Sequence, residues 1–184
     1  MGRDRKGKSF EIALSAVATA LAVAGLTFGF FVPYMLATGY LIAVVALMIP
    51  LSKQFYWGDA LAYAATCILT VIFGATMRLW DLVPFIMFFG LHPLINSLQI
   101  RFKINRWIAL AVKALWFDLT LWVAYILIFS VSGGSFLPES VLDFIRRFLP
   151  LVIIVGGSLI FWLYDYLVFK CQIFVNNAVY RIRR

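Results

Sequence analysis

Charged residues and cysteines are scarce in this sequence. Asp, Glu, Lys and Arg together make up 13% of the 184 residues, about half of the ~25% that is typical of soluble domains. Hydrophobic residues make up 64%, which is more apolar surface than a soluble domain of this length can bury. Two cysteines, Cys67 and Cys171, are too few for a zinc site or a disulfide scaffold. The composition excludes a soluble, disordered or disulfide-stabilised protein and predicts an all-α integral membrane protein.

Motifs for catalysis and for metal binding are also missing. The single histidine, His92, and the scattered carboxylates do not supply three or four metal ligands at helical spacing, so we expect no metal and no cofactor. The sequence has no Gly-x-x-x-x-Gly-Lys-Ser/Thr loop for ATP. Ser158 follows two glycines, but Leu159 stands where an intramembrane serine protease would have a glycine. We therefore predict that the protein is not an enzyme.

The basic residues flank the apolar runs, which is typical of membrane topology signals and not of a nucleic-acid-binding face. The net charge is +8, from sixteen Lys and Arg against eight Asp and Glu. Placing the N-terminus inside puts twelve of the basic residues in the cytoplasm and three outside, with Lys113 within a span. This bias predicts a protein of the cell membrane whose N- and C-termini both lie in the cytoplasm. We expect contact with the lipid bilayer and no nucleic-acid partner.

Breaks in apolar character divide the chain into six candidate spans of roughly the ~20 residues that cross a bilayer. The fourth span is interrupted by Pro93, and a short amphipathic stretch from Val141 to Arg147 precedes the sixth. We therefore predict one domain, residues 1–184, that is a bundle of six transmembrane helices. The predicted spans are Phe10–Val32, Tyr34–Leu51, Gly58–Thr76, Leu82–Gln99, Trp107–Val131 and Phe148–Phe169.

Small residues form two rows on the first span. Ala16, Ala20 and Ala24 recur at four-residue spacing and share one helix face, and Ala18 and Ala22 form a second row beside it. Small residues favour helix association in lipid because they let two backbones approach closely. The rows fit packing within the protein's own bundle, or a docking face for another membrane subunit.

A six-helix chain of this size, basic at both ends and with an Ala-x-x-x-Ala face on its first helix, resembles the substrate-binding S component of energy-coupling factor (ECF) vitamin transporters. The run LIAVVALMIPLSKQFYWGDALAYAATCILTVIFG, residues 41–74, is similar to the second and third helices of those proteins. The resemblance implies binding of a vitamin-like small-molecule solute from the outside. It also implies docking through Ala16, Ala20 and Ala24 onto a membrane coupling subunit that two cytoplasmic ATPases energise.

A function of another class stays open beside this one: a non-transporting membrane scaffold or an accessory subunit of an envelope complex. For the transporter, the predicted topology gathers aromatic and polar residues at the outer helix ends, where they suit a planar organic ligand. Each residue alone fits a membrane-interface belt equally well. The predicted substrate-binding residues are Phe28, Phe30, Tyr34, Arg78, Trp80, Asp81, Trp122 and Tyr125, beside the Ser132–Ser135 loop.

Ionisable residues at membrane depth are costly and are functional candidates by default. At ~1.5 Å per residue, His92 and Asp118 both fall near the middle of the bilayer, so we predict that they contact each other between the fourth and fifth spans. Asn96 and Lys113 both fall about 10 Å from the inner face and are within reach of each other. Lys113 has an alternative, which is to extend its side chain to the cytoplasmic interface.

Overall fold

The computed structural model describes residues 2–32, 34–73, 79–132, 143 and 147–182. All regular elements within these ranges are helices, which confirms the all-α prediction. Among the described residues, five helical stretches are long and apolar enough to cross a membrane: Ser9–Phe31, Tyr56–Phe73, Leu79–Arg101, Arg106–Leu127 and Arg147–Arg181. A further apolar helix, Leu36–Leu51, has 16 residues. At ~1.5 Å per residue it measures about 24 Å, which is shorter than the ~30 Å hydrocarbon core.

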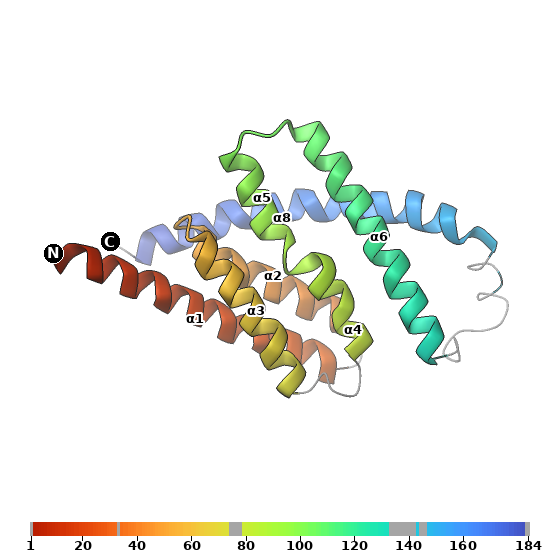
Figure 1. The fold of residues 1–184 in the computed structure, drawn as a ribbon, viewed down its shortest axis with the longest axis horizontal. Helices are drawn as coiled ribbons and strands as arrows, with labels where there is room; N and C mark the ends of the chain where they lie inside the picture. The colour runs from red at the N-terminus through yellow and green to blue at the C-terminus, as the bar shows by residue number, and fades with distance from the viewer. Residues whose placement is uncertain (1, 33, 74–78, 133–142, 144–146, 183–184) are drawn as a thin grey trace.

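The helices follow one another with short connections where the connections are described (Figure 1). The start of α1 and the end of α8 lie at the same end of the molecule in this view. The elements are α1 (Gly2–Phe31), α2 (Leu36–Leu51), α3 (Tyr56–Phe73), α4 (Leu79–Pro84), the π-helix η2 (Phe85–Phe89), α5 (His92–Arg101), α6 (Arg106–Ser132), the π-helix η3 (Val152–Gly157) and α8 (Ser158–Ile182).

The prediction for the end of the last helix is wrong, because α8 continues past Phe169 to Ile182. No Gly or Pro interrupts residues 170–182, and Val175 and Val179 are buried against the rest of the bundle. The polar residues of this stretch face outward, and Gln172 donates a hydrogen bond of 2.9 Å to Asn176 Oδ1 one turn later. Cys171 therefore lies inside the helix and not beyond it.

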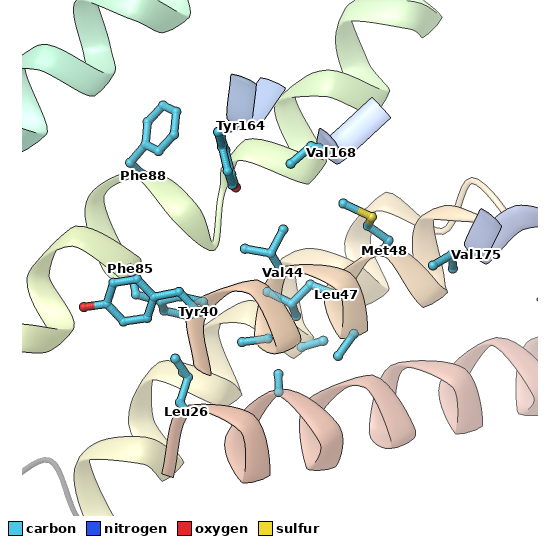
Figure 2. Packing of buried hydrophobic residues seen from close by; sticks show 14 of the residues in the cluster. Leu26, Tyr40, Val44, Leu47, Met48, Phe85, Phe88, Tyr164, Val168 and Val175 are labelled. Carbon is cyan, nitrogen blue, oxygen red and sulfur yellow. The ribbon is translucent and has the colours of Figure 1, made fainter. Parts of the chain in front are cut away.

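The central helix is the short one, α2. It packs against α1, α3, η2, α5 and α8, so most of its side chains are buried, while Leu41 and Ile42 remain exposed. Its side chains Tyr40, Val44 and Met48 belong to a buried cluster that also takes in aromatic residues of η2 and α8, among them Phe88 and Tyr164 (Figure 2). This cluster is the core of the molecule.

Glycines make the crossing of α1 and α2 unusually close. A Cβ atom added to Gly39 of α2 would lie 2.7 Å from the carbonyl oxygen of Gly25 and 2.9 Å from Cα of Gly29. Both neighbours are backbone atoms, so they cannot yield as a side chain would. Gly25 and Gly29 form a Gly-x-x-x-Gly motif, the spacing that lets two membrane helices touch through their backbones.

The fourth span is broken upstream of the predicted position. The interruption begins at η2, where the Gly90 N–H bonds the Phe85 carbonyl at 2.9 Å in the i→i+5 pattern of a π-helix. After a turn at Gly90 and Leu91, α5 starts at His92, and Pro93 occupies its first turn, where a proline needs no hydrogen-bond donor. Pro93 therefore marks the restart of the helix, and the irregular stretch lies before it.

Tyrosines from neighbouring helices satisfy backbone groups around this break. The Tyr63 hydroxyl of α3 donates to the Ile86 carbonyl at 2.7 Å, and the Tyr40 hydroxyl of α2 donates to the Asp81 carbonyl. A carbonyl freed from its helical partner is expensive in hydrocarbon unless a neighbour supplies a donor. The two tyrosines thus hold the broken helix in place and fix the position of His92.

Candidate functional site

Four polar side chains from three helices meet inside the bundle, and we name them the polar cluster: His92, Asn96, Lys113 and Asp165. His92 and Asn96 lie four residues apart on α5 and therefore share one face. Lys113 comes from α6 and Asp165 from α8. Their exposed fractions are 0%, 5%, 3% and 3%, so each one is removed from both water and lipid.

Lys113 is the centre of this cluster. Its Nζ lies 2.6 Å from Asp165 Oδ1 and 2.6 Å from Asn96 Oδ1, which are short, charge-assisted distances. His92 Nε2 lies 3.2 Å from the same Asp165 oxygen, although the ring is not oriented for a good hydrogen bond. One ammonium and one carboxylate balance each other, and the imidazole stands beside them as a third group able to carry charge.

Aromatic rings surround the polar cluster. The ring centroids of Phe88 and Tyr164 both lie 5.0 Å from that of His92, and Phe161 adds an edge contact at 6.0 Å. The Phe169 ring centroid lies 5.3 Å from Lys113 Nζ, at the distance of a cation–π contact. These rings exclude water, and the low dielectric that they create strengthens every electrostatic contact within the cluster.

Several polar atoms at the cluster have no hydrogen-bond partner in the structure, although they are buried. They are both ring nitrogens of His92, Asn96 Nδ2 and the Tyr164 hydroxyl, and one turn further along the same face of α5, Gln99 Oε1. Buried polar groups are nearly always hydrogen-bonded in proteins, so a group of unsatisfied ones requires an explanation. Together they offer both donors and acceptors to a polar molecule.

The predicted contact between His92 and Asp118 is wrong. The carboxylate beside His92 is Asp165, and Asp118 Oδ1 has no hydrogen-bond partner. Asp118 lies on the side of α6 that faces η3, where a Cβ added to Gly157 would be 2.7 Å from its Oδ1. The depth estimate placed Asp118 near His92 along the membrane normal, but it did not determine which side of α6 carries the carboxylate.

The contact between Asn96 and Lys113 is confirmed, and the alternative in which Lys113 extends to the interface is wrong, because its side chain is buried. Asp165 was missed in the sequence. It stands between Tyr164 and Tyr166, which look like membrane-interface anchors and suggest that the span ends there. Since α8 continues to Ile182, Asp165 lies in the bundle interior, and only Tyr166 remains exposed.

The residues predicted to form an outer binding site differ widely in exposure. Phe30 is part of the core, whereas Tyr34 is fully exposed. Asp81 is buried and its backbone carbonyl is bound by Tyr40. Arg78 and residues 133–135 lie outside the described residues, as does the Ser132 side chain. Of the remaining members, Phe28 and Trp122 are exposed and Trp80 and Tyr125 are half-buried.

The two alanine rows of α1 have different environments. Ala18 and Ala22 are completely buried against the protein's own helices. Ala16, Ala20 and Ala24 are exposed, so this row is not used in the bundle. The close helix contact that α1 does make runs through Gly25 and Gly29, whose motif the sequence contained but which we did not predict.

A second buried carboxylate lies apart from the polar cluster, in the first turn of α3. Asp59 is 1% exposed, and neither of its carboxylate oxygens has a hydrogen-bond partner.

Among the described residues no three His, Cys, Asp or Glu side chains gather closely enough to hold a metal ion. In comparisons with protein-family models, curated proteins and solved structures, nothing matches this chain.

Proposed function

We propose that this protein is the membrane-embedded, substrate-binding subunit of a small-molecule uptake transporter of the ECF type. In this proposal α2 is a sixth span, both termini are cytoplasmic, and the solute is a vitamin-like organic molecule. The observation that carries the proposal is the buried polar cluster of His92, Asn96, Lys113 and Asp165, which lies at membrane depth between three helices.

The chemistry of the polar cluster suits a small solute with both polar atoms and a ring. The Lys113 ammonium and the unsatisfied Asn96 amide donate, Asp165 accepts, and His92 does either. Phe88, Phe161 and Tyr164 provide flat apolar surfaces beside these groups. Pockets for small ligands commonly combine such aromatic walls with a few placed polar groups.

The broken helix provides support of a second kind. The irregular stretch from η2 to Leu91 ends directly at His92, and a second π-helix, η3, leads into α8, which carries Asp165. π-helical turns are frequently found at functional sites, and interrupted membrane helices in transporters line substrate sites. Both interruptions adjoin helices that contribute to the polar cluster.

Transport driven by ATP requires a partner protein, because this chain has no ATP-binding loop. The exposed row of Ala16, Ala20 and Ala24 offers a surface on which such a partner can dock. These alanines leave α1 smooth along one face, so the backbone of another membrane helix can approach closely. We propose that a membrane coupling subunit docks there and that two cytoplasmic ATPases drive it.

Mass spectrometry of small molecules released from the purified protein tests the solute-binding half of the proposal. We expect one organic solute to be enriched in the wild-type protein and to be lost from Asp165→Asn, which removes the anion of the polar cluster. Asp118→Asn is the matched control, since it neutralises a carboxylate of α6 outside the cluster, and it should retain the solute. Equal solute content in all three proteins would contradict the proposal.

Affinity purification from membranes of the source organism tests docking. The wild-type protein should carry with it a membrane subunit and two ATPases that contain the Gly-x-x-x-x-Gly-Lys-Ser/Thr loop. Ala20→Trp should lose them, whereas Ala64→Trp, at an exposed alanine of α3, should not. If neither ATPases nor a solute accompany the wild-type protein, the scaffold function becomes the better interpretation.

A further inference from the structure

A groove of about 410 Å³ lies where the turn between α5 and α6 meets the side of α8. Its rim carries three cations: Lys103 from the turn, Arg106 from the first residue of α6, and Lys170 from α8. None of the residues that line it is acidic. The groove is therefore electropositive, and its charges come from segments that are distant in the sequence.

Beside the three cations, most of the residues that line the groove are apolar, and the groove is open to the outside of the bundle. Ile100, Ile104 and Ile173 line it, and their exposed fractions are 61%, 48% and 59%. Trp107 follows directly after Arg106 and is 77% exposed, as expected of a side chain at the boundary between lipid and water. The groove thus combines basic groups at the membrane interface with an apolar track alongside.

One side chain at the groove points to a bound molecule with polar atoms. Gln99 lines the groove, is 7% exposed, and has an Oε1 atom without a hydrogen-bond partner. Lys103 has φ = 51°, a left-handed conformation that glycine and asparagine adopt far more readily. The turn therefore carries a charged lysine at a position where its backbone is unfavourable.

We propose that this groove binds one anionic phospholipid. The phosphate group lies among Lys103, Arg106 and Lys170, the hydroxyls of the headgroup donate to Gln99 Oε1, and an acyl chain follows the exposed isoleucines. Basic pockets between membrane helices are suited to anionic headgroups, whereas a zwitterionic lipid brings no net charge to offset three cations. The inference does not rest on the proposed function.

Native mass spectrometry of the full-length protein released from nanodiscs tests the assignment. The nanodiscs contain equal amounts of phosphatidylglycerol and phosphatidylcholine. We expect the wild-type protein to retain one phosphatidylglycerol. A basic residue near a membrane surface strengthens binding roughly fivefold, so the triple variant Lys103→Asn, Arg106→Gln, Lys170→Gln should bind this lipid roughly 100-fold more weakly.

Two controls separate this groove from general surface charge. Lys53→Gln removes a cation from the turn between α2 and α3, outside the groove, and should bind phosphatidylglycerol as the wild type does. Lys170→Arg keeps the charge and should also bind normally, which shows that a substitution at this position does not block binding when the charge is kept. Lys103→Asn suits the left-handed backbone, so that change does not strain the turn.

Three outcomes would overturn the proposal. The first is equal retention of phosphatidylglycerol by the wild-type protein and the triple variant. The second is retention of phosphatidylcholine as strongly as phosphatidylglycerol by the wild-type protein. The third is displacement of the lipid by glycerol 3-phosphate at equimolar concentration, because the acyl chain would then contribute nothing and the groove would be a site for soluble phosphate compounds.

Discussion

The ion pair between Lys113 and Asp165 makes a quantitative prediction about stability. Asp165→Asn keeps the size of the side chain but leaves the Lys113 ammonium buried without its carboxylate. Removing one partner of a buried ion pair costs about 3–5 kcal/mol, whereas a single hydrogen bond within a membrane protein contributes about 0.6 kcal/mol on average. We therefore expect Asp165→Asn to lower the free energy of unfolding by about 3–5 kcal/mol.

The loss should depend on the charge of Lys113. Lys113→Met alone leaves Asp165 beside His92, which can accept a proton and replace the missing cation, so its cost should be smaller. In the double variant no uncompensated ammonium remains, and most of the stability should return. The double-mutant cycle should yield a coupling free energy of about 2–3 kcal/mol, in the upper part of the range for residues in contact.

Reversible unfolding in mixed micelles of a neutral detergent and sodium dodecyl sulfate, followed by tryptophan fluorescence, measures these free energies. Asp118→Asn is the reference, since this carboxylate has no cation assigned to it and its neutralisation should show no coupling to Lys113→Met. If the effects of Asp165→Asn and Lys113→Met add to within about 0.5 kcal/mol, the two charges do not interact as the structure indicates, and the reasoning is refuted.

Two further substitutions test the packing and the second buried carboxylate. Gly39→Ala should destabilise the protein by about 1–3 kcal/mol, because the added Cβ meets backbone atoms of α1. Gly156→Ala is the control and should not destabilise the protein, because the space around Gly156 is open. Equal effects of the two substitutions in the same unfolding assay would contradict the close crossing of α1 and α2. Asp59→Asn should stabilise the protein by about 1 kcal/mol, because a buried carboxylate without hydrogen-bond partners is costly to ionise. A loss of stability in this variant would contradict the prediction and indicate a partner of Asp59 that the structure does not show.

Hydropathy was sufficient to place the helices along the chain but not to orient them. The stretches Ser9–Phe31 and Arg106–Leu127 match predicted spans closely, because a run of apolar residues between basic ends has one interpretation in a membrane. Hydropathy says little about which side of each helix faces the protein interior, because lipid-facing and buried positions are both apolar. Phe28 and Phe30 illustrate the problem: both were assigned to a binding site, yet one is exposed and the other lies in the core.

Polar residues gave better guidance, because a charge in hydrocarbon has few tolerable positions. The helical rise alone was enough to pair Asn96 with Lys113 across two helices. The same estimate failed for His92, since depth fixes one coordinate and the facing side of the helix is the other. Asp165 was not considered at all, because the tyrosines beside it are typical of a membrane interface and the sequence does not show that α8 continues for several more turns.

Close packing does not by itself explain why the bundle contains the polar cluster, and that point favours the proposed binding role. Replacing a buried ion pair by well-packed apolar residues is often neutral or stabilising. In a membrane, apolar residues are tolerated both where a helix faces lipid and where it faces other helices. Packing alone would therefore favour leucine or phenylalanine at Lys113 and Asp165. Instead the structure gathers both charges with His92 and Asn96 and leaves several buried polar atoms without hydrogen-bond partners. The solute of the proposed function would use those atoms, which is why the arrangement supports that proposal.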